Sequence, residues 1–174
     1  MKMIAIVAAA LALLAAGSAR AEVVDAQPNG FEVKHQVVIA ASASAVWAML
    51  VTPSKWWASA HTWSGSAANL SLGAASGGCF CERLPNGGSV LHMTTVNAVP
   101  GQKLVLAGAL GPMQSSGASG ALTFLLAEKD GQTTVTVTYD VGGYFKGGLD
   151  KIAAPVDGVL GQQVAGLKAA SEAK

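Results

Sequence analysis

Alternating apolar and polar residues mark the start of the folded part of the chain. Between residues 31 and 40 the odd positions carry Phe, Val, His, Val and Ile, whereas the first three even positions carry Glu, Lys and Gln. A repeat of two residues is typical of a strand with one buried face. We therefore expect a strand over residues 31–40.

Short apolar runs separated by glycine-rich turns continue as far as the Gly142-Gly143 pair. They predict six more strands, at residues 69–72, 79–84, 89–99, 103–110, 121–128 and 133–141. The turn signals are Pro-Asn-Gly-Gly at residues 85–88, Pro-Gly at 100–101 and Asp-Gly at 130–131. A parallel connection needs a dozen or more residues, so strands this close together must form an antiparallel meander.

Two short helices are expected between the first and second strands. Ser42 or Ser44 can cap the first of them. Its apolar positions are Val46, Trp47, Met49 and Leu50. Because proline is well tolerated in a first helical turn, Pro53 ends this helix and allows a second one over residues 54–60.

The tail from residue 149 to residue 173 has the spacing of an amphipathic helix. Its apolar stripe consists of Ile152, Val156, Val159, Leu160, Val164 and Leu167. Gln162, Gln163 and Lys168 lie off that stripe. Four glycine or proline residues make the segment a poor helix by propensity, so we expect its stability to come from packing on the sheet.

The first 21 residues have the order of a secretory signal peptide. A positive charge at Lys2 precedes an apolar run of about 13 residues, and the small-residue site Ala19-Arg20-Ala21 follows. A membrane anchor needs about 20 apolar residues. We therefore expect cleavage after Ala21, a flexible leader over residues 22–30, one domain over 31–174, no remaining transmembrane anchor, and a periplasmic or secreted protein.

Charge excludes one large class of partner. Without Lys2 and Arg20, nine of the 11 basic residues remain against ten acidic ones in a mature chain of 153 of the 174 residues. No basic surface for nucleic acid is expected from this balance. A chain of this length forms one domain with a sizeable core and needs no stabilising metal or disulfide framework.

The chain has two cysteines, Cys79 and Cys81, separated by one residue. In an extended strand their Cβ atoms lie farther apart than the ~4 Å of a disulfide, so a bridge requires a bulge. Buried free thiols are the favoured interpretation. A bridge across a bulge and a metal or redox site are the alternatives.

Several segments together resemble a known superfamily. They are residues 39–47 (IAASASAVW), 77–82 (GGCFCE), 96–105 (VNAVPGQKLV) and the closing helix. In this order they resemble the START/polyketide cyclase (SRPBCC) superfamily, and most closely homologues of the activator of heat-shock-protein ATPase. The resemblance implies an α+β helix-grip fold, with a curved antiparallel sheet of about seven strands around a long C-terminal helix. It also implies a cavity for an apolar ligand.

Glu82 and His92 are the strongest candidates for chemistry. The resemblance places the face of Phe80, Glu82 and Leu84 toward the cavity, and a three-residue loop over 86–88 would pair Glu82 with His92 and Phe80 with Thr94. A slip of one residue would set Cys81 opposite His92 instead. A carboxylate beside an imidazole in an apolar cavity can transfer protons, bind a polar ligand group, or simply satisfy itself.

Other candidates would contact the ligand. Three tryptophans surround His61 in residues 55–63, and Trp57 and His61 can form part of a cavity mouth. Met113 lies in a glycine- and serine-rich loop that can fold over the entrance. The predicted ligand-binding residues are thus Trp57, His61, Phe80, Glu82, His92 and Met113.

Two functions fit these residues. The first is an exported protein that binds or carries a hydrophobic small molecule, such as a lipid or a polyketide. The second is a cyclase, dehydratase or isomerase in which Glu82 and His92 transfer protons. No cofactor is expected, and no metal, because His35, His61, His92 and the cysteines lack the spacing of known zinc motifs. The oligomeric state stays open.

Overall fold

A computed structural model describes residues 20–173, which form one antiparallel sheet and a long C-terminal helix. The strands are β1 (Arg20–Gln27), β2 (Gly30–Ile39), β3 (Leu70–Leu72), β4 (Cys79–Arg83), β5 (Ser89–Val99), β6 (Lys103–Gly108), β7 (Gly117–Lys129) and β8 (Gln132–Tyr144). Their order in the sheet is β1-β2-β8-β7-β6-β5-β4-β3. The α+β fold predicted from the sequence is confirmed.

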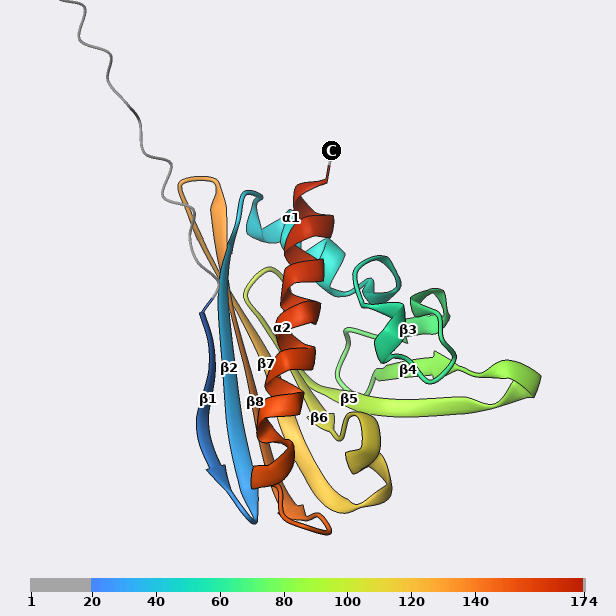
Figure 1. Ribbon diagram of the computed structural model, residues 1–174. Helices are drawn as coiled ribbons and strands as arrows, with labels where there is room; N and C mark the ends of the chain where they lie inside the picture. The colour runs from blue at the N-terminus through green and yellow to red at the C-terminus, as the bar shows by residue number, and fades with distance from the viewer. Residues whose placement is uncertain (1–19, 174) are drawn as a thin grey trace, which may run out of the picture.

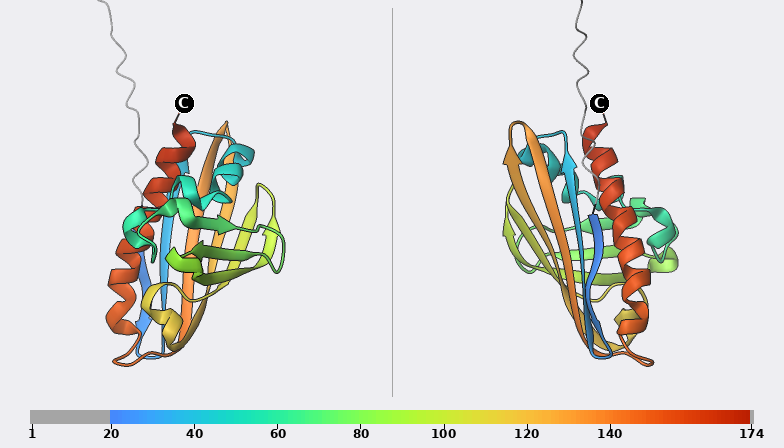
Figure 2. Two further views of the ribbon diagram at one scale, coloured as in Figure 1. Left: turned by 90° about the vertical axis from the view of Figure 1, so that its right-hand side faces the viewer. Right: turned by 60° about the vertical axis from the view of Figure 1, so that its left-hand side comes forward.

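The sheet curls so strongly that its two ends run in different directions. In Figure 1, β2 and β8 run along the helix α2 (Asp150–Glu172), whereas β5 and β4 run across the molecule. Figure 2 shows α2 along one face of the long strands, with the short strands to its side. This arrangement is the helix-grip architecture, and the space between α2 and β4–β5 contains the site described below.

The helix α2 begins and ends within one residue of its predicted bounds. Its buried residues include Leu160, Val164 and Leu167 from the predicted stripe, together with Ala153. They pack in the same hydrophobic core as the inward residues of β2 and β8. Gln163 is a correction: it was predicted to lie off the stripe, yet it is only 2% exposed.

The segment between β2 and β3 was predicted less well. The first short helix is present as α1 (Ala43–Leu50), and Ser42 caps it by accepting a hydrogen bond from the Ala45 N–H. The second predicted helix, residues 54–60, is wrong. It is replaced by the 3-10 turns η1 (Pro53–Lys55) and η2 (Ser59–His61), because Gln163 takes the Ala58 N–H that a helix would have used.

The predicted flexible leader over residues 22–30 is also wrong. Residues 20–27 form β1, which pairs with β2 at the edge of the sheet and raises the number of strands from seven to eight. The reason is that β2 has a free edge, and its unpaired backbone groups bind another strand whatever that strand's pattern. Residues 1–19, with most of the predicted signal peptide, lie outside the described residues.

Within residues 20–173, no helix is long and apolar enough to cross a membrane. A third 3-10 turn, η3 (Ala67–Asn69), leads into β3, and a fourth, η4 (Pro85–Gly87), closes the β4–β5 hairpin. The last, η5 (Gly111–Ser115), lies in the loop between β6 and β7. These turns position the loops that surround the site.

Candidate functional site

The β4–β5 hairpin brings Glu82 and His92 together, although not in the predicted register. Glu82 pairs with Val90 and Phe80 with Met93, so the predicted Glu82–His92 and Phe80–Thr94 pairs are wrong. The ladder shifts by one residue between Phe80 and Cys81, and His92 is the extra residue on β5. Because of this bulge His92 and Met93 are both buried, at 7% and 1% exposed, instead of alternating.

The carboxylate of Glu82 is only 1% exposed and has three partners. The backbone N–H of Trp63 donates to Oε2 at 3.1 Å, and that of Ser64 donates to Oε1 at 2.5 Å. His92 Nε2 lies 2.9 Å from Oε2. The buried charge thereby links β4, β5 and the loop that precedes β3.

These contacts set the ionisation of the pair. Burial by itself would raise the pKa of Glu82, but hydrogen bonds from Ser64, Trp63 and His92 outweigh it and hold the pKa below its ordinary 4.5. Burial lowers the pKa of His92 below 6.5, although Glu82 opposes this. At neutral pH the pair is therefore a carboxylate beside a neutral imidazole.

The neutral imidazole has one consistent tautomer. A carboxylate accepts hydrogen bonds and donates none, so His92 Nε2 carries the proton. Nδ1 then accepts from Gln114 Nε2 at 3.2 Å, and the same amide nitrogen lies 3.3 Å from the Leu91 carbonyl oxygen. Gln114 Oε1 accepts from the indole N–H of Trp63 at 2.9 Å. The network is a closed circuit, from Glu82 through His92 and Gln114 to Trp63 and back.

A cavity of about 260 Å³ lies against this network. Its walls include Trp57, Phe80 and His92, whose rings are in contact in that order. Trp57 and Phe80 meet edge to face with centroids 5.3 Å apart, and Phe80 and His92 are tilted with centroids 5.0 Å apart. The other lining residues are Ala60, His61, Thr62, Trp63, Leu70, Leu110, Gly111, Pro112 and Val159. Five of the six predicted ligand-binding residues therefore meet here, four in the wall and Glu82 behind His92.

Met113, the sixth, lies beside this cavity. It is 1% exposed and lines a second cavity of about 180 Å³ between η5 and α2. The two cavities share Leu110, Gly111, Pro112 and Val159 as walls. Deeper in the molecule, beneath Trp56 and Phe80, the space shrinks to about 10 Å³. The cavities of about 260 and 180 Å³ thus lie at the mouth, between loops, β4–β5 and α2.

Two glutamines of α2 hold the mouth loop in place. Gln162 Oε1 lies 2.8 Å from His61 Nε2, and Gln163 Oε1 accepts from the Ala58 N–H at 2.8 Å. The loop also approaches the helix closely at Gly166, where a Cβ atom would lie 2.4 Å from the Trp56 carbonyl oxygen. The position of His61 therefore depends on α2 as much as on its own loop.

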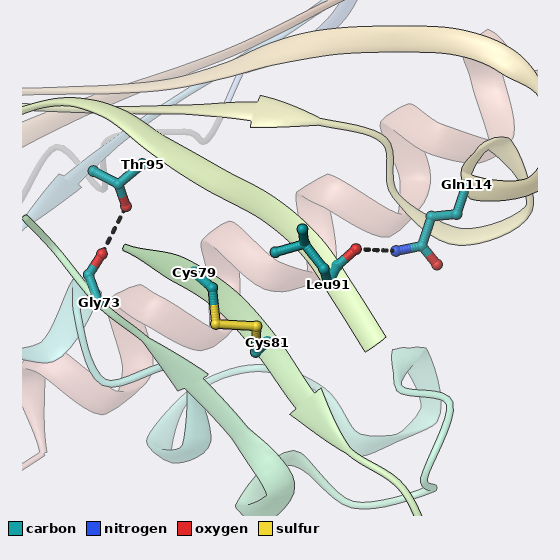
Figure 3. The surroundings of a disulfide bond; sticks show 6 residues. All are labelled: Gly73, Cys79, Cys81, Leu91, Thr95 and Gln114. Carbon is teal, nitrogen blue, oxygen red and sulfur yellow. Dashed lines mark hydrogen bonds between the residues drawn. A yellow bond between two sulfur atoms is a disulfide. The ribbon is translucent and has the colours of Figure 1, made fainter. Parts of the chain in front are cut away.

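Cys79 and Cys81 form a disulfide, so the favoured prediction of free thiols is wrong (Figure 3). The condition attached to a bridge is met, because the β-bulge falls between Phe80 and Cys81. Both cysteines are partly buried and belong to the face of β4 opposite Phe80 and Glu82. The alternative of a thiol metal site is overturned as well.

Sequence reasoning missed part of the network. Gln114 was not singled out, because a lone glutamine in a loop has no pattern that indicates a partner. Ser64 contributes a backbone N–H, which every residue except proline carries. Trp63 was noted in the tryptophan cluster, and its role as a donor to Gln114 depends on how η5 packs. In the described residues, no three His, Cys, Asp or Glu side chains gather as a metal site would require.

Comparison with known proteins places the chain in one family. The family model described as polyketide cyclase/dehydrase and lipid transport matches residues 30–172. No curated protein matches significantly. An uncharacterised protein from Rhizobium leguminosarum has a similar structure, with a TM-score of 0.62 at 17% identity over 89% of this chain and 98% of that one.

Two further solved structures share the fold. The Aha1 dimer from Colwellia psychrerythraea has a TM-score of 0.58 at 23% identity, over 81% of this chain and 96% of that one. CalU16 from Micromonospora echinospora has a TM-score of 0.59 at 9% identity, over 90% and 87% of the two chains. At these identities the likeness shows the fold alone. The predicted SRPBCC superfamily is confirmed by the family model that matches residues 30–172.

Proposed function

The chain belongs to the polyketide cyclase/dehydrase and lipid transport family, and from this premise we propose that it binds a hydrophobic small molecule in the cavity beside His92. The family description names both enzymes and carriers, so it does not choose between them. The choice depends on the residues of the site.

The observation that carries the proposal is a cavity with largely apolar walls next to a polar network that is already satisfied. The Glu82 carboxylate accepts three hydrogen bonds, and both ring nitrogens of His92 have partners. With its Nε2 proton donated to Glu82 and its Nδ1 bound to Gln114, the His92 ring has no free lone pair for a substrate proton. This arrangement supports binding rather than turnover.

The cavity suits a ligand with an aromatic or otherwise flat apolar body. Trp57, Phe80 and His92 present ring faces and edges, and such contacts favour flat apolar groups. The adjoining cavity has aliphatic walls from Met113, Val156 and other residues, and can receive an alkyl extension. His61 and the Thr62 hydroxyl supply polar contacts at the mouth.

The same proposal places the protein in the periplasm or outside the cell. Two features support it: the signal-like pattern of the first 21 residues, and a disulfide, which persists in oxidising compartments. N-terminal sequencing of exported protein is expected to begin at Glu22. An intact Met1 in that material would contradict this part of the proposal.

One observation favours a second candidate, an enzyme of the cyclase, dehydratase or isomerase type. The 2.9 Å contact between Glu82 and His92 orients the imidazole, as a carboxylate orients a catalytic histidine. For His92 to act as a base, however, its Nδ1 must exchange Gln114 for the substrate. Gln114→Ala would then raise turnover or leave it unchanged, whereas binding without chemistry predicts no turnover at all.

Binding is tested with 1-aminoanthracene, a flat apolar probe whose fluorescence rises in a dry site. We expect saturable binding that Val159→Trp weakens at least tenfold, because Val159 lines both cavities and a larger side chain fills them. Ala165→Trp is the matched control, since Ala165 is exposed on the same helix. Equal affinity in the two variants, or no binding to the native protein, would reject the proposed cavity.

A further inference from the structure

We propose that the Cys79–Cys81 disulfide is a positioning element of the site: by holding the β-bulge it keeps His92 against Glu82, and a dithiol reductant releases it. The first observation is the coincidence of the bridge and the bulge. Cys79 pairs with Thr94 and Cys81 with Leu91, so two residue steps on β4 lie opposite three steps on β5. The bridge spans that interval and no other part of β4.

The second observation is a distance. The Cα atoms of Cys79 and Cys81 are 5.4 Å apart. Two steps of a regular strand span about 6.6 Å, from a rise of about 3.3 Å per residue. The bridge therefore holds this part of β4 shorter than a regular strand, which disfavours a regular ladder here. Opening the bridge removes this restriction and makes the regular register accessible.

A regular β4–β5 register would separate the residues of the site, because only the hairpin end of β5 would move. Beyond the bulge β5 is held by pairing with β6, and Thr95 exchanges backbone hydrogen bonds with Gly77 and Gly78. Its hydroxyl also donates to the Gly73 carbonyl oxygen at 2.7 Å (Figure 3). Met93 and Thr95 are each 1% exposed, so turning this end outward costs more than moving the hairpin end.

The hairpin end is the part free to slip. With residues 93–99 kept in place, loss of the bulge sets Cys81 opposite His92. Cys81 lies on the face opposite Glu82, so the imidazole would follow it away from the carboxylate. The contacts with Gln114 would be lost too. In the structure Leu91 pairs with Cys81, and Gln114 binds both the Leu91 carbonyl oxygen and His92. The slip would move both of these residues.

The bridge is accessible to small reductants. Both cysteines are partly exposed, and Leu91 opposite Cys81 is 59% exposed. A thiolate of dithiothreitol attacks one sulfur to form a mixed disulfide and frees the other cysteine as a thiol. The second thiol of the reagent then closes on the mixed disulfide. Dithiothreitol leaves as a cyclic disulfide, and two electrons and two protons have passed to Cys79 and Cys81.

The test follows the histidine rings by ¹H–¹⁵N NMR during pH titration. In the oxidised protein His92 should give the signals of an Nε2–H tautomer. After reduction, or in the Cys79→Ser/Cys81→Ser double variant, we expect a second set of His92 signals that titrates at higher pH, as an exposed imidazole does. His35 contacts Asp157 of α2 and lies outside the cavity wall, so it serves as the internal control. Reoxidation of the native protein should restore the first set.

The outcomes separate this inference from the proposed function, on whose site it rests. Unchanged His92 signals in both the reduced protein and the double variant would overturn it, whether or not a probe binds. An equal change at His35 would also overturn it, since it would indicate general unfolding. As a second readout, reduction should weaken 1-aminoanthracene binding at least threefold. The double variant, which has no bridge, should not respond to the reductant.

Discussion

The two ends of the sheet are built on different principles. Where α2 covers the long strands, β2 and β8 pair along the whole of β2 without a register shift, and so do β7 and β8. At the other end β4 and β5 pair through a bulge, and loops held by side-chain hydrogen bonds replace the helix as a cover. The first region is stabilised by apolar burial, and the second by a few specific polar contacts.

The difference explains why a cavity lies beside His92. Regular strands and a long helix have interlocking surfaces, and their side chains fill the space between them. A bulged hairpin and short 3-10 turns do not interlock in this way, so space remains near His92 and Val159. Buried polar groups at such a place require partners, which the network supplies. The bulged β4–β5 hairpin and the loops beside it therefore form the cavity next to His92.

The largest expected effect on stability comes from a substitution where α2 covers the long strands. Leu167 is fully buried, so Leu167→Ala should lower the free energy of unfolding by about 2–5 kcal/mol, because it removes buried surface and leaves a void. Leu110 borders both cavities and is partly exposed, so Leu110→Ala should cost about 1 kcal/mol or less. Urea unfolding measures both. Equal losses would remove the contrast between the two ends.

The second prediction concerns the polar network. Glu82→Gln and His92→Ala should be non-additive, with a coupling free energy of about 0.5–3 kcal/mol, because each change leaves the partner group buried without its complement. The pair of Asp150 and the exposed Lys151 is the control, and no comparable coupling is expected there. Urea unfolding of the single and double variants measures the coupling free energy of each pair. Additive losses would show that Glu82 and His92 act independently.

The third prediction is a pH dependence. The folded pKa values of His92 and Glu82 both lie below their ordinary values of 6.5 and 4.5, so the unfolded chain binds more protons below each value. Stability should therefore fall as the pH drops below about 6.5 and fall further below about 4.5. His92→Gln should abolish the first decline, as measured by unfolding across the pH range. A decline of equal size in that variant would assign it to another group.

The smallest effect is expected at Trp63. Trp63→Phe keeps the backbone N–H that binds Glu82 and removes the indole donor to Gln114. This side chain is 56% exposed, so the variant should lose about 1 kcal/mol or less. Its clearer consequence is a broadened His92 NMR signal, since Gln114 is then held less firmly. A sharp, unshifted signal would show that Trp63 does not contribute to the site.

Several elements were predictable because local patterns specify them. The alternation in residues 31–39 and the stripe of Val164 and Leu167 reflect backbone repeats, and the structure buries those positions. The inward phase of Phe80 and Glu82 followed from the same alternation together with the family resemblance. Glu82 and His92 were expected to be neighbours, and they are, although the pairing proposed to bring them together was wrong.

The predictions that failed concern segments whose structure depends on contacts with residues distant in the sequence. The helix expected at residues 54–60 is broken because Gln163, more than 100 residues away, binds the Ala58 N–H. The strand β1 exists because β2 offers a free edge. Gln114 joins His92 because the loop between β6 and β7 folds back on the hairpin. None of these choices is visible in the composition or spacing of the segment concerned.

The sequence by itself determined the strand and helix periods, the antiparallel order and the residues available for chemistry, because these follow from backbone geometry over a few positions. Tertiary structure alone decided the bulge at Phe80–Cys81, the disulfide, and the hydrogen-bond circuit around Glu82. A register shift of one residue changes few local preferences. It does change which side chains are buried, and that is settled only when β6, η5 and α2 pack together.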